Sequence, residues 1–316
     1  METTPQTRSV LVTGATGFVG GAIVRALRQR GHSVVGLVRD RAKARGLEEQ
    51  GVRIVVGDML APDTYLPLVP TVDAVIQAAQ YGVAGRFTRK TVARINHADE
   101  TMSLALAQVC LAHGKRFVYT SGCFNYGDHG AEWITEATPF TPSPLGEGHA
   151  ALTTELLRRH RQDGLDAVIL LPGFVYGPGG LFKSSFVDQL AKKQLRVIGR
   201  GENYWTCVHV DDLAIAFALA VERASAGTMV NIMDDQPLTL RALVDQLTDA
   251  LDKKRVGTIP PWLMGLILGG PLVTSLTTSF RIGNDQAKAV LGWAPRYPSF
   301  ADGLPDTLDA LTARTG

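Results

Sequence analysis

Three glycines at three-residue spacing give the first chemical signal in this sequence. Gly14, Gly17 and Gly20 follow the apolar run at residues 10–12. In such a loop the first glycine allows a sharp turn, the second lets the backbone approach a phosphate, and the third lets the next helix pack closely. The start of that helix would direct free N–H groups and its positive dipole end toward an anion. The spacing predicts a loop that binds the pyrophosphate of a dinucleotide, although glycines that serve packing alone give the same pattern.

A basic turn after the second apolar run bears on which dinucleotide is bound. Arg39 and Lys43 follow the apolar run at residues 34–38. An acidic side chain at this point would bind the ribose hydroxyls of NAD and repel an added phosphate, whereas Arg39 can pair with a 2′-phosphate. We therefore expect NADPH in preference to NADH, with NADH as the second choice. The alternative interpretation is a charged turn that is only solvated.

Alternating strands and helices must carry these loops. Apolar runs predict strands at 10–12, 34–38, 52–56, 74–78, 116–120, 167–171 and 228–232. Helical periodicity predicts helices at 21–30, 91–113, 150–161 and 240–251, and a further helix that residues 208–212 open and that runs to about 222. This order predicts an α/β fold, a Rossmann-type doubly wound parallel sheet with a smaller C-terminal substrate-binding lobe. We expect a dinucleotide-binding domain at 1–172 and a mostly substrate-binding lobe at 173–316, with 208–232 returning to the sheet. Ligands of such sheets bind at the carboxyl ends of the strands.

The composition argues against several classes of partner. The 316 residues carry a net charge of +2, with no basic cluster beyond residues 39–45, so we expect no nucleic acid. The three cysteines, Cys110, Cys123 and Cys207, lie far apart and lack metal-ligand spacing. This predicts no metal, no disulfide framework and a cytoplasmic protein. We expect no secretion signal in the polar residues 1–8. The oligomeric state stays open.

One apolar segment, residues 262–276, is the only stretch that suggests a membrane. It is shorter than the roughly 20 apolar residues that span a bilayer, and Gly269, Gly270 and Pro271 interrupt it. We therefore expect no membrane partner. We interpret the segment as a buried helix or an apolar lid.

Six short motifs occur in the same order as in a known protein family. They lie at residues 13–20, 57–59, 118–127, 171–179, 208–212 and 291–296. With them the whole chain resembles the extended short-chain dehydrogenase/reductase superfamily, which includes the sugar-nucleotide epimerases and dehydratases and the dihydroflavonol reductases. The resemblance implies an NAD(P)H-dependent oxidoreductase. It also implies that Asp211 and Asp212 cap the start of a helix rather than take part in catalysis, and core packing is the better account of Trp293 and Phe300.

The resemblance also assigns cofactor contacts, with Arg39 and Lys43 at the 2′-phosphate. The remaining contacts fall into four groups. They are the pyrophosphate site at Gly14, Thr16, Gly17, Phe18 and Val19, the adenine site at Asp58 and Met59, the ribose site at Ala78, Ala79 and Gln80, and the nicotinamide site at Pro172, Phe174 and Val175.

The catalytic positions are where this sequence departs from the family. The family uses a Ser or Thr four residues before the Tyr of a Tyr-Gly pair, and a Tyr-x-x-x-Lys on the next helix. Here the serine position holds Gly122, the tyrosine position Glu147 and the lysine position Ala151. No tyrosine or lysine occurs between Gly127 and Val175 to replace them. In addition, Asp99 and Glu100 stand where the family has Gly-Thr, and Leu171 where it often has arginine.

Hydride transfer to a ketone creates negative charge on the ketone oxygen, which must be stabilised. Without the family's catalytic groups, three interpretations remain open. The first is a substitute acid, either Glu147 or a tyrosine from a neighbouring loop, Tyr81 or Tyr176. Ser121 would then touch a substrate oxygen. The second is a substrate that carries its own acid, such as a ketone beside a phenol, so that the protein only orients the reactants. The third is a protein without redox activity.

The second solution is the function we expect. It is an NADPH-preferring ketoreductase for a bulky aromatic ketone, an angucyclinone-like polyketide of antibiotic biosynthesis, because the pattern is similar to atypical extended reductases of antibiotic pathways. The alternatives are an NADP-binding sensor or scaffold, or a sugar-nucleotide or small-molecule isomerase. We expect the substrate to contact residues that follow the strands or lie in aromatic-rich segments, namely Tyr81, Ser121, Cys123, Tyr176, Phe182, Phe186, Tyr204 and Trp205.

Overall fold

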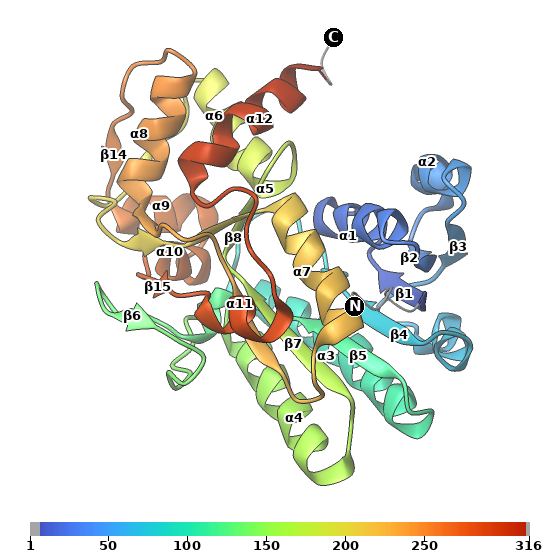
Figure 1. The fold of residues 1–316 in the computed structure, drawn as a ribbon. Helices are drawn as coiled ribbons and strands as arrows, with labels where there is room; N and C mark the ends of the chain where they lie inside the picture. The colour runs from blue at the N-terminus through green and yellow to red at the C-terminus, as the bar shows by residue number, and fades with distance from the viewer. Residues whose placement is uncertain (1–6, 314–316) are drawn as a thin grey trace.

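The computed structural model describes residues 7–313 and is built around a central parallel sheet (Figure 1). Within those residues the sheet has seven strands in the order β12-β7-β5-β4-β1-β2-β3, which confirms the predicted α/β fold. Their bounds are β1 Ser9–Thr13, β2 Ser33–Val38, β3 Arg53–Val56, β4 Ala74–Gln77, β5 Arg116–Thr120, β7 Ala167–Pro172 and β12 Met229–Ile232.

The sheet is buried on both faces, which explains why its strands are continuous apolar runs. On β1, Leu11 packs into one hydrophobic core while Val10 and Val12 pack into the other, and all three are fully buried. Successive side chains of a strand point to opposite faces, so a strand between two helical layers must be apolar at every position.

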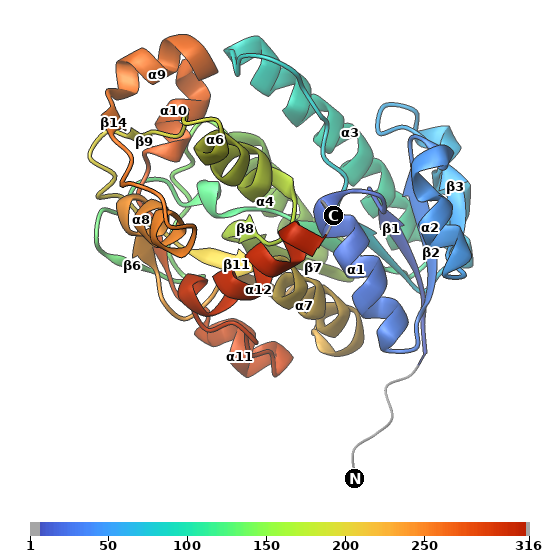
Figure 2. The ribbon, with the colours of Figure 1, turned by 90° about the horizontal axis from the view of Figure 1, so that it is seen from above.

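Helices cover the two faces of the sheet in pairs (Figures 1 and 2). On one face α1 (Phe18–Gln29) packs against α7 (Val210–Arg223), and on the other α3 (Arg89–Ala112) packs against α4 (Glu147–Asp163). α7 and β12 follow residue 209 in the sequence yet lie with the central sheet.

Most of the remaining elements gather beyond the carboxyl end of the sheet (Figure 2). The exceptions are α2, which lies at the β3 edge, and α11, which contacts β12 and α7. Four strand pairs order them, β8 with β11, β9 with β14, β10 with β13, and β6 with β15. Their bounds are α2 Arg45–Glu49, β6 Trp133–Ile134, β8 Phe174–Tyr176, α5 Gly180–Phe182, α6 Asp188–Ala191, β9 Val197–Ile198, β10 Tyr204–Trp205, β11 Cys207–His209, β13 Leu238–Thr239, α8 Leu240–Ala250, β14 Thr258–Ile259, α9 Pro261–Leu268, α10 Gly270–Leu276, β15 Arg281–Ile282, α11 Asp285–Leu291 and α12 Phe300–Ala313.

The apolar segment 262–276 differs from the buried helix that the sequence suggested. It splits at Gly269 into α9 and α10, and α9 buries none of its side chains. Trp262 is 70% exposed. Among the described residues, no helix has the length and apolar character needed to cross a membrane.

The start of α7 corrects a second expectation. The side chain that caps this helix is His209, whose Nδ1 accepts a hydrogen bond from the Asp211 N–H at 3.2 Å. The Asp212 carboxylate instead accepts from the backbone N–H groups of Arg296 and Tyr297, at 2.8 and 3.0 Å. The prediction that the acidic pair caps its own helix was therefore wrong, because Asp212 anchors the last motif of the chain.

Candidate active site

The glycine loop has the geometry that its spacing predicts. Gly14 adopts a φ of +66°, and a Cβ there would lie 2.8 Å from the Ala79 Cα. A Cβ on Gly20 would lie 2.1 Å from the Gly14 oxygen, so only glycine lets α1 begin this close to β1. α1 starts after Gly17 with no side-chain cap and no acidic residue in its first turn. Its first N–H groups therefore remain available to an anion, and the cradle fits a dinucleotide pyrophosphate.

Thr13 is a contributor that the sequence assignments omitted. Its hydroxyl oxygen accepts hydrogen bonds from the backbone N–H groups of Ala78 and Ala79, both at 3.0 Å. This holds the turn after β4 against the glycine loop. The omission arose because Thr13 is fully buried and acts on a segment 65 residues away.

Phe18 closes the loop from the side of the C-terminal elements. A Cβ on Gly179 or Gly180 would lie 3.0 or 2.4 Å from the Phe18 ring, so that glycine-rich turn packs flat against it. Thr16 is exposed and Val19 is half-buried. The predicted pyrophosphate residues therefore lie around one turn.

The predicted adenosine-end residues lie at the carboxyl ends of β2 and β3. Arg39 and Lys43 are exposed, and no described residue forms an ion pair with either. The neighbouring Arg41 is already paired with Glu48 at 2.7 Å. Asp58 accepts a hydrogen bond from the Leu60 N–H at 2.9 Å. The side chain of Met59 is buried, which leaves its backbone as the group able to contact a ligand.

At the nicotinamide end, Phe174 presents a half-buried ring beside two aromatic side chains. Its centroid lies 4.9 Å from that of Trp205 and 5.4 Å from that of Phe186. Val175 is half-buried as well, whereas Pro172 is buried at the end of β7. We call Phe174, Phe186 and Trp205 the aromatic wall.

Two predicted substrate contacts, Tyr176 and Phe182, are corrected by their burial. Both are fully buried, with ring centroids 6.1 Å apart. The Tyr176 hydroxyl donates a hydrogen bond to the Ser299 carbonyl at 3.3 Å. Burial raises the pKa of Tyr176 above its ordinary value of 10.0. The expectation that Tyr176 reaches a substrate as an acid was wrong, because its ring belongs to the core next to α12.

The adjacent residues Tyr204 and Trp205 do not share one pocket wall. Tyr204 lies against Arg281, whose guanidinium carbon is 5.3 Å from the ring centroid, and Arg281 also lies over Trp133 at 4.3 Å. Neighbours on a strand point to opposite sides. Trp205 therefore joins the aromatic wall and Tyr204 faces away from it. A substrate contact for Tyr204 would therefore be separate from the aromatic wall, and it stays a prediction.

Ser121 and Cys123 are also turned inward. The Ser121 Oγ lies 2.8 Å from the Thr153 Oγ1 on α4 and accepts a hydrogen bond from Asn125 at 2.9 Å. Cys123 is buried, and burial raises its pKa to about 12. The Ser121 hydroxyl thus joins the end of β5 to α4, and its contact with a substrate oxygen stays a prediction.

Glu147 and Ala151 form one exposed strip on α4. They are four residues apart, so they lie on the same side of the helix, and both are exposed. A Cβ on Gly122 would meet no atom within 4 Å. The three positions where the family has its catalytic side chains are therefore open, and here they offer only the Glu147 carboxylate.

A buried polar network lies on the opposite side of α4. Asp99 accepts hydrogen bonds from Tyr119 at 2.7 Å, Gln77 at 2.9 Å and Ser103 at 3.0 Å. The Nδ1 of His149 lies 2.8 Å from the Tyr119 hydroxyl. Gln77 also donates to the Ala79 carbonyl at 3.2 Å, so the network supports the turn beside the glycine loop. Asp99, which the sequence marked only as a departure, is its centre.

Tyr119 does not replace the missing catalytic tyrosine. Burial, followed by the charge of Asp99, raises the pKa of Tyr119 well above 10.0, and its hydroxyl is already bound by Asp99 and His149. Tyr81, the remaining candidate, accepts a hydrogen bond from Arg94 at 3.2 Å. Over residues 7–313, none of the seven tyrosines hydrogen-bonds a lysine.

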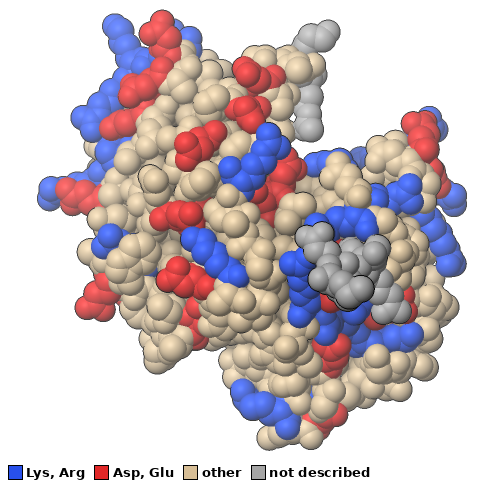
Figure 3. Space-filling model, viewed as in Figure 1, with Lys and Arg blue, Asp and Glu red and all other residues tan. Residues whose placement is uncertain are grey.

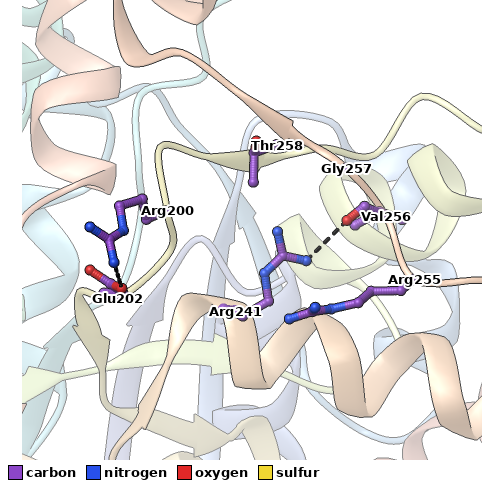
Figure 4. A pocket seen from close by; sticks show the side chains of 7 residues that line it. All are labelled: Arg200, Glu202, Arg241, Arg255, Val256, Gly257 and Thr258. Atoms are coloured by element: carbon purple, nitrogen blue, oxygen red, sulfur yellow. Dashed lines mark hydrogen bonds and ion pairs between the residues drawn. The ribbon is translucent and has the colours of Figure 1, made fainter.

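A hollow of about 480 Å³ lies between β14 and the start of α8, and none of the predicted site residues lines it (Figure 4). Three arginines line it, Arg200, Arg241 and Arg255. Basic and acidic side chains are interspersed over this half of the molecule (Figure 3). Among the described residues, no cluster of His, Cys, Asp or Glu is arranged to hold a metal ion.

Comparison with known proteins now identifies the family. The model of the NAD dependent epimerase/dehydratase family matches residues 10–232. The chain belongs to this family. A 3-diazoavenalumate denitrifying reductase from a Streptomyces species is 30% identical over 306 residues, covering 93% of this chain and 98% of the relative. A 2-alkyl-3-oxoalkanoate reductase from Stenotrophomonas maltophilia is 32% identical over 265 residues, covering 78% of this chain and 77% of the relative.

A solved structure shares the fold of this family member. The dTDP-glucose 4,6-dehydratase DesIV from Streptomyces venezuelae, with NAD and TYD bound, superimposes with a TM-score of 0.83. It covers 98% of both chains at 24% identity. Together with the family and the reductases related to it, these findings identify the chain as an NAD(P)-dependent oxidoreductase that uses a nicotinamide cofactor.

Proposed function

We propose that this protein is an NADPH-preferring ketoreductase for a bulky aromatic ketone, and that a phenol next to the ketone supplies the proton. The observation that carries the proposal is the strip at Gly122, Glu147 and Ala151. Glu147 and Ala151 are exposed, a Cβ on Gly122 would have space, and the three positions hold neither the hydroxyls nor the lysine ammonium of the family. A protein that keeps the dinucleotide cradle without a proton donor can still reduce a substrate that quenches its own alkoxide.

The pocket chemistry supports a flat aromatic substrate. Phe174 offers a half-buried ring backed by Phe186 and Trp205, and offset or tilted stacking on such a ring favours another aromatic system. Both curated relatives described above are named as reductases, one of them for a 3-oxoalkanoate, which is a ketone. A polyketide of the angucyclinone kind, made in an antibiotic pathway, fits both features.

A substitution at Glu147 tests whether the protein supplies the acid. We predict that Glu147→Gln lowers turnover of a phenolic ketone by about tenfold or less, because a true general acid contributes roughly 100-fold or more. Ser121→Ala, at a hydroxyl that binds Thr153, serves as the internal comparison. The measurement is the loss of NADPH absorbance with substrate present. A fall to the uncatalysed rate in Glu147→Gln would refute substrate-assisted protonation.

The proposed preference for NADPH depends on Arg39. Because Arg39 is exposed and without an ionic partner among the described residues, its guanidinium can bind a 2′-phosphate in two-pronged fashion. We predict that Arg39→Asp shifts the ratio of kcat/KM values toward NADH by at least about tenfold, since a charge-assisted pair is replaced by repulsion. Arg53→Asp, at the opposite end of β3, is the matched control. An unchanged ratio would remove Arg39 from the 2′-phosphate site.

The vacant strip also favours a second candidate, an NADP-binding sensor or scaffold. Such a protein needs the cradle and has no use for a proton donor. It would bind NADPH, seen as a change in nicotinamide fluorescence, while no aromatic ketone oxidises the cofactor. An isomerase on the same fold would leave the reduced cofactor concentration unchanged while converting its substrate.

A further inference from the structure

The helix α9 exposes a continuous apolar face. It carries four of the nine large apolar side chains that are exposed between residues 7 and 313. These are Trp262 at 70%, Leu263 at 37%, Leu266 at 61% and Ile267 at 57% exposure, and we call them the α9 patch. Contiguous apolar surface of this kind marks a site of interaction more often than scattered apolar residues do.

Contacts at both ends fix the helix so that this face stays outward. At its start, a Cβ on Gly199 would lie 3.6 Å from the Pro261 ring. At its end, the Phe87 N–H donates to the Leu268 carbonyl at 2.8 Å. Arg86 donates to the Gly265 carbonyl at 3.4 Å. Figure 2 shows α9 and the first turns of α3 side by side along one edge of the molecule.

The border of the α9 patch on the α3 side is strongly basic. Residues 81–98 contain Arg86, Arg89, Lys90 and Arg94 and no acidic residue. All four cations are exposed. Arg86 also touches α9 directly, through Gly265. A positive rim therefore adjoins the apolar face.

At the start of α9, the α9 patch is bordered by the hollow that three arginines line (Figure 4). Arg200 pairs there with Glu202 at 2.7 Å, and Arg241 and Arg255 share Asp245. Three guanidinium groups thus meet two carboxylates, so this border is less basic than the α3 side. From residue 253 to residue 284 the sequence has four cations and no acid.

We propose that the α9 patch and its basic borders dock the protein on an anionic lipid surface. The apolar side chains would enter the boundary between headgroups and acyl chains, and the cations would lie at the level of the lipid phosphates. This departs from the expectation of no membrane partner, because lying on a surface needs neither the length nor the continuous hydropathy of a spanning helix. The proposal is independent of the ketoreductase assignment.

Flotation of the full chain with lipid vesicles tests it. We predict binding to vesicles of equimolar phosphatidylglycerol and phosphatidylcholine, weakened by added salt, and little binding to phosphatidylcholine alone. No binding to the anionic vesicles, or equal binding to both compositions, would overturn the proposal. The assay uses no ketone, so its failure and that of the proposed function are distinguishable.

Two double variants separate the apolar and ionic contributions. Trp262→Ser with Ile267→Ser, and Arg89→Glu with Lys90→Glu, should each weaken vesicle binding by at least about tenfold. The matched controls are Val290→Ser, which removes an exposed apolar side chain on α11, and Arg53→Glu on β3, and both should bind as the wild type does. All these side chains are exposed or rim groups, so thermal melting should be unchanged.

Other occupants of the α9 patch give different results. If a second copy of the chain covers it, Trp262→Ser with Ile267→Ser would halve the sedimenting mass. If the patch belongs to the substrate cleft, the same variant would change the KM for the ketone while vesicle binding stays at the wild-type level. Either result would overturn lipid docking.

Discussion

At the scale of single residues, the proposed chemistry depends on three differences from the family. Gly122 has open space where a Cβ would stand, and Glu147 and Ala151 are exposed on one side of α4. Side chains that are bound to each other elsewhere in the fold, such as Ser121 and Tyr119, do not substitute for them. The three positions that the resemblance assigns to catalysis therefore hold none of the family's catalytic groups.

Restoring those groups should restore their function. We predict that Gly122→Ser, Glu147→Tyr and Ala151→Lys together raise the reduction of a ketone lacking a neighbouring phenol by roughly 100-fold, the usual contribution of a positioned general acid. The control replaces Glu147 by Phe with the other two changes kept, which removes only the hydroxyl. NADPH consumption measures both. Equal rates in the Tyr and Phe versions would contradict the assignment of these positions.

At the scale of elements, the start of α4 shows why no neighbouring side chain takes over. A Cβ on Gly146 would lie 2.2 Å from the Phe124 oxygen, and one on Gly148 would lie 2.5 Å from the Asn96 side chain. These close approaches fix the helix against α3 and against the turn at Cys123–Asn125 that follows β5. His149 therefore stays with Tyr119 and Asp99, on the side away from Glu147 and Ala151.

A second junction of elements carries a pH dependence. Asp234, two residues after β12, is buried. Its Oδ1 accepts a hydrogen bond from the Gln236 N–H at 3.3 Å, and no described residue hydrogen-bonds its Oδ2. Burial, together with the charges of Asp235, Asp212 and Asp302, raises its pKa to about 8. Folding thus takes up a proton between about pH 4, where the unfolded side chain titrates, and about pH 8. The stability from this group is complete below about pH 4 and is lost as the pH rises toward 8.

Asp234→Asn should remove this loss, because the amide stays neutral at every pH. We predict that the variant gains about 1 to 3 kcal/mol over the wild type at pH 8, and much less at pH 5, since an unpaired buried charge costs that much or more. Thermal melts of both proteins across this pH range measure it. Parallel pH profiles of the two melting temperatures would show that Asp234 does not titrate on folding.

At the scale of the whole molecule, the central sheet and the glycine loop could be predicted from the sequence better than the substrate contacts. Apolar runs such as residues 10–12 mark the buried strands because the sheet is covered on both faces, and Gly14 and Gly20 have the close contacts that their spacing implied. These are local signals. The pocket depends on direction and on distant partners, which residue type alone does not give.

Tyr176, Phe182 and Tyr204 illustrate this limit. Each is an aromatic residue near a motif, yet two enter the core beside α12 and the third stacks on Arg281. Asp99 and Thr13 were missed for the same reason, since their partners come from other strands and helices. The exposure of α9 was hidden because its composition alone suggests burial.

One comparison tests most directly whether the substrate supplies the proton. An aromatic ketone with a phenol next to its carbonyl is compared with its O-methyl ether, in the wild-type protein with NADPH. We predict that the ether binds but is reduced at least about 100-fold more slowly than the phenol. Neither the protein nor the ether then has an acid that can protonate the alkoxide. Equal kcat/KM values for the two ketones would contradict it.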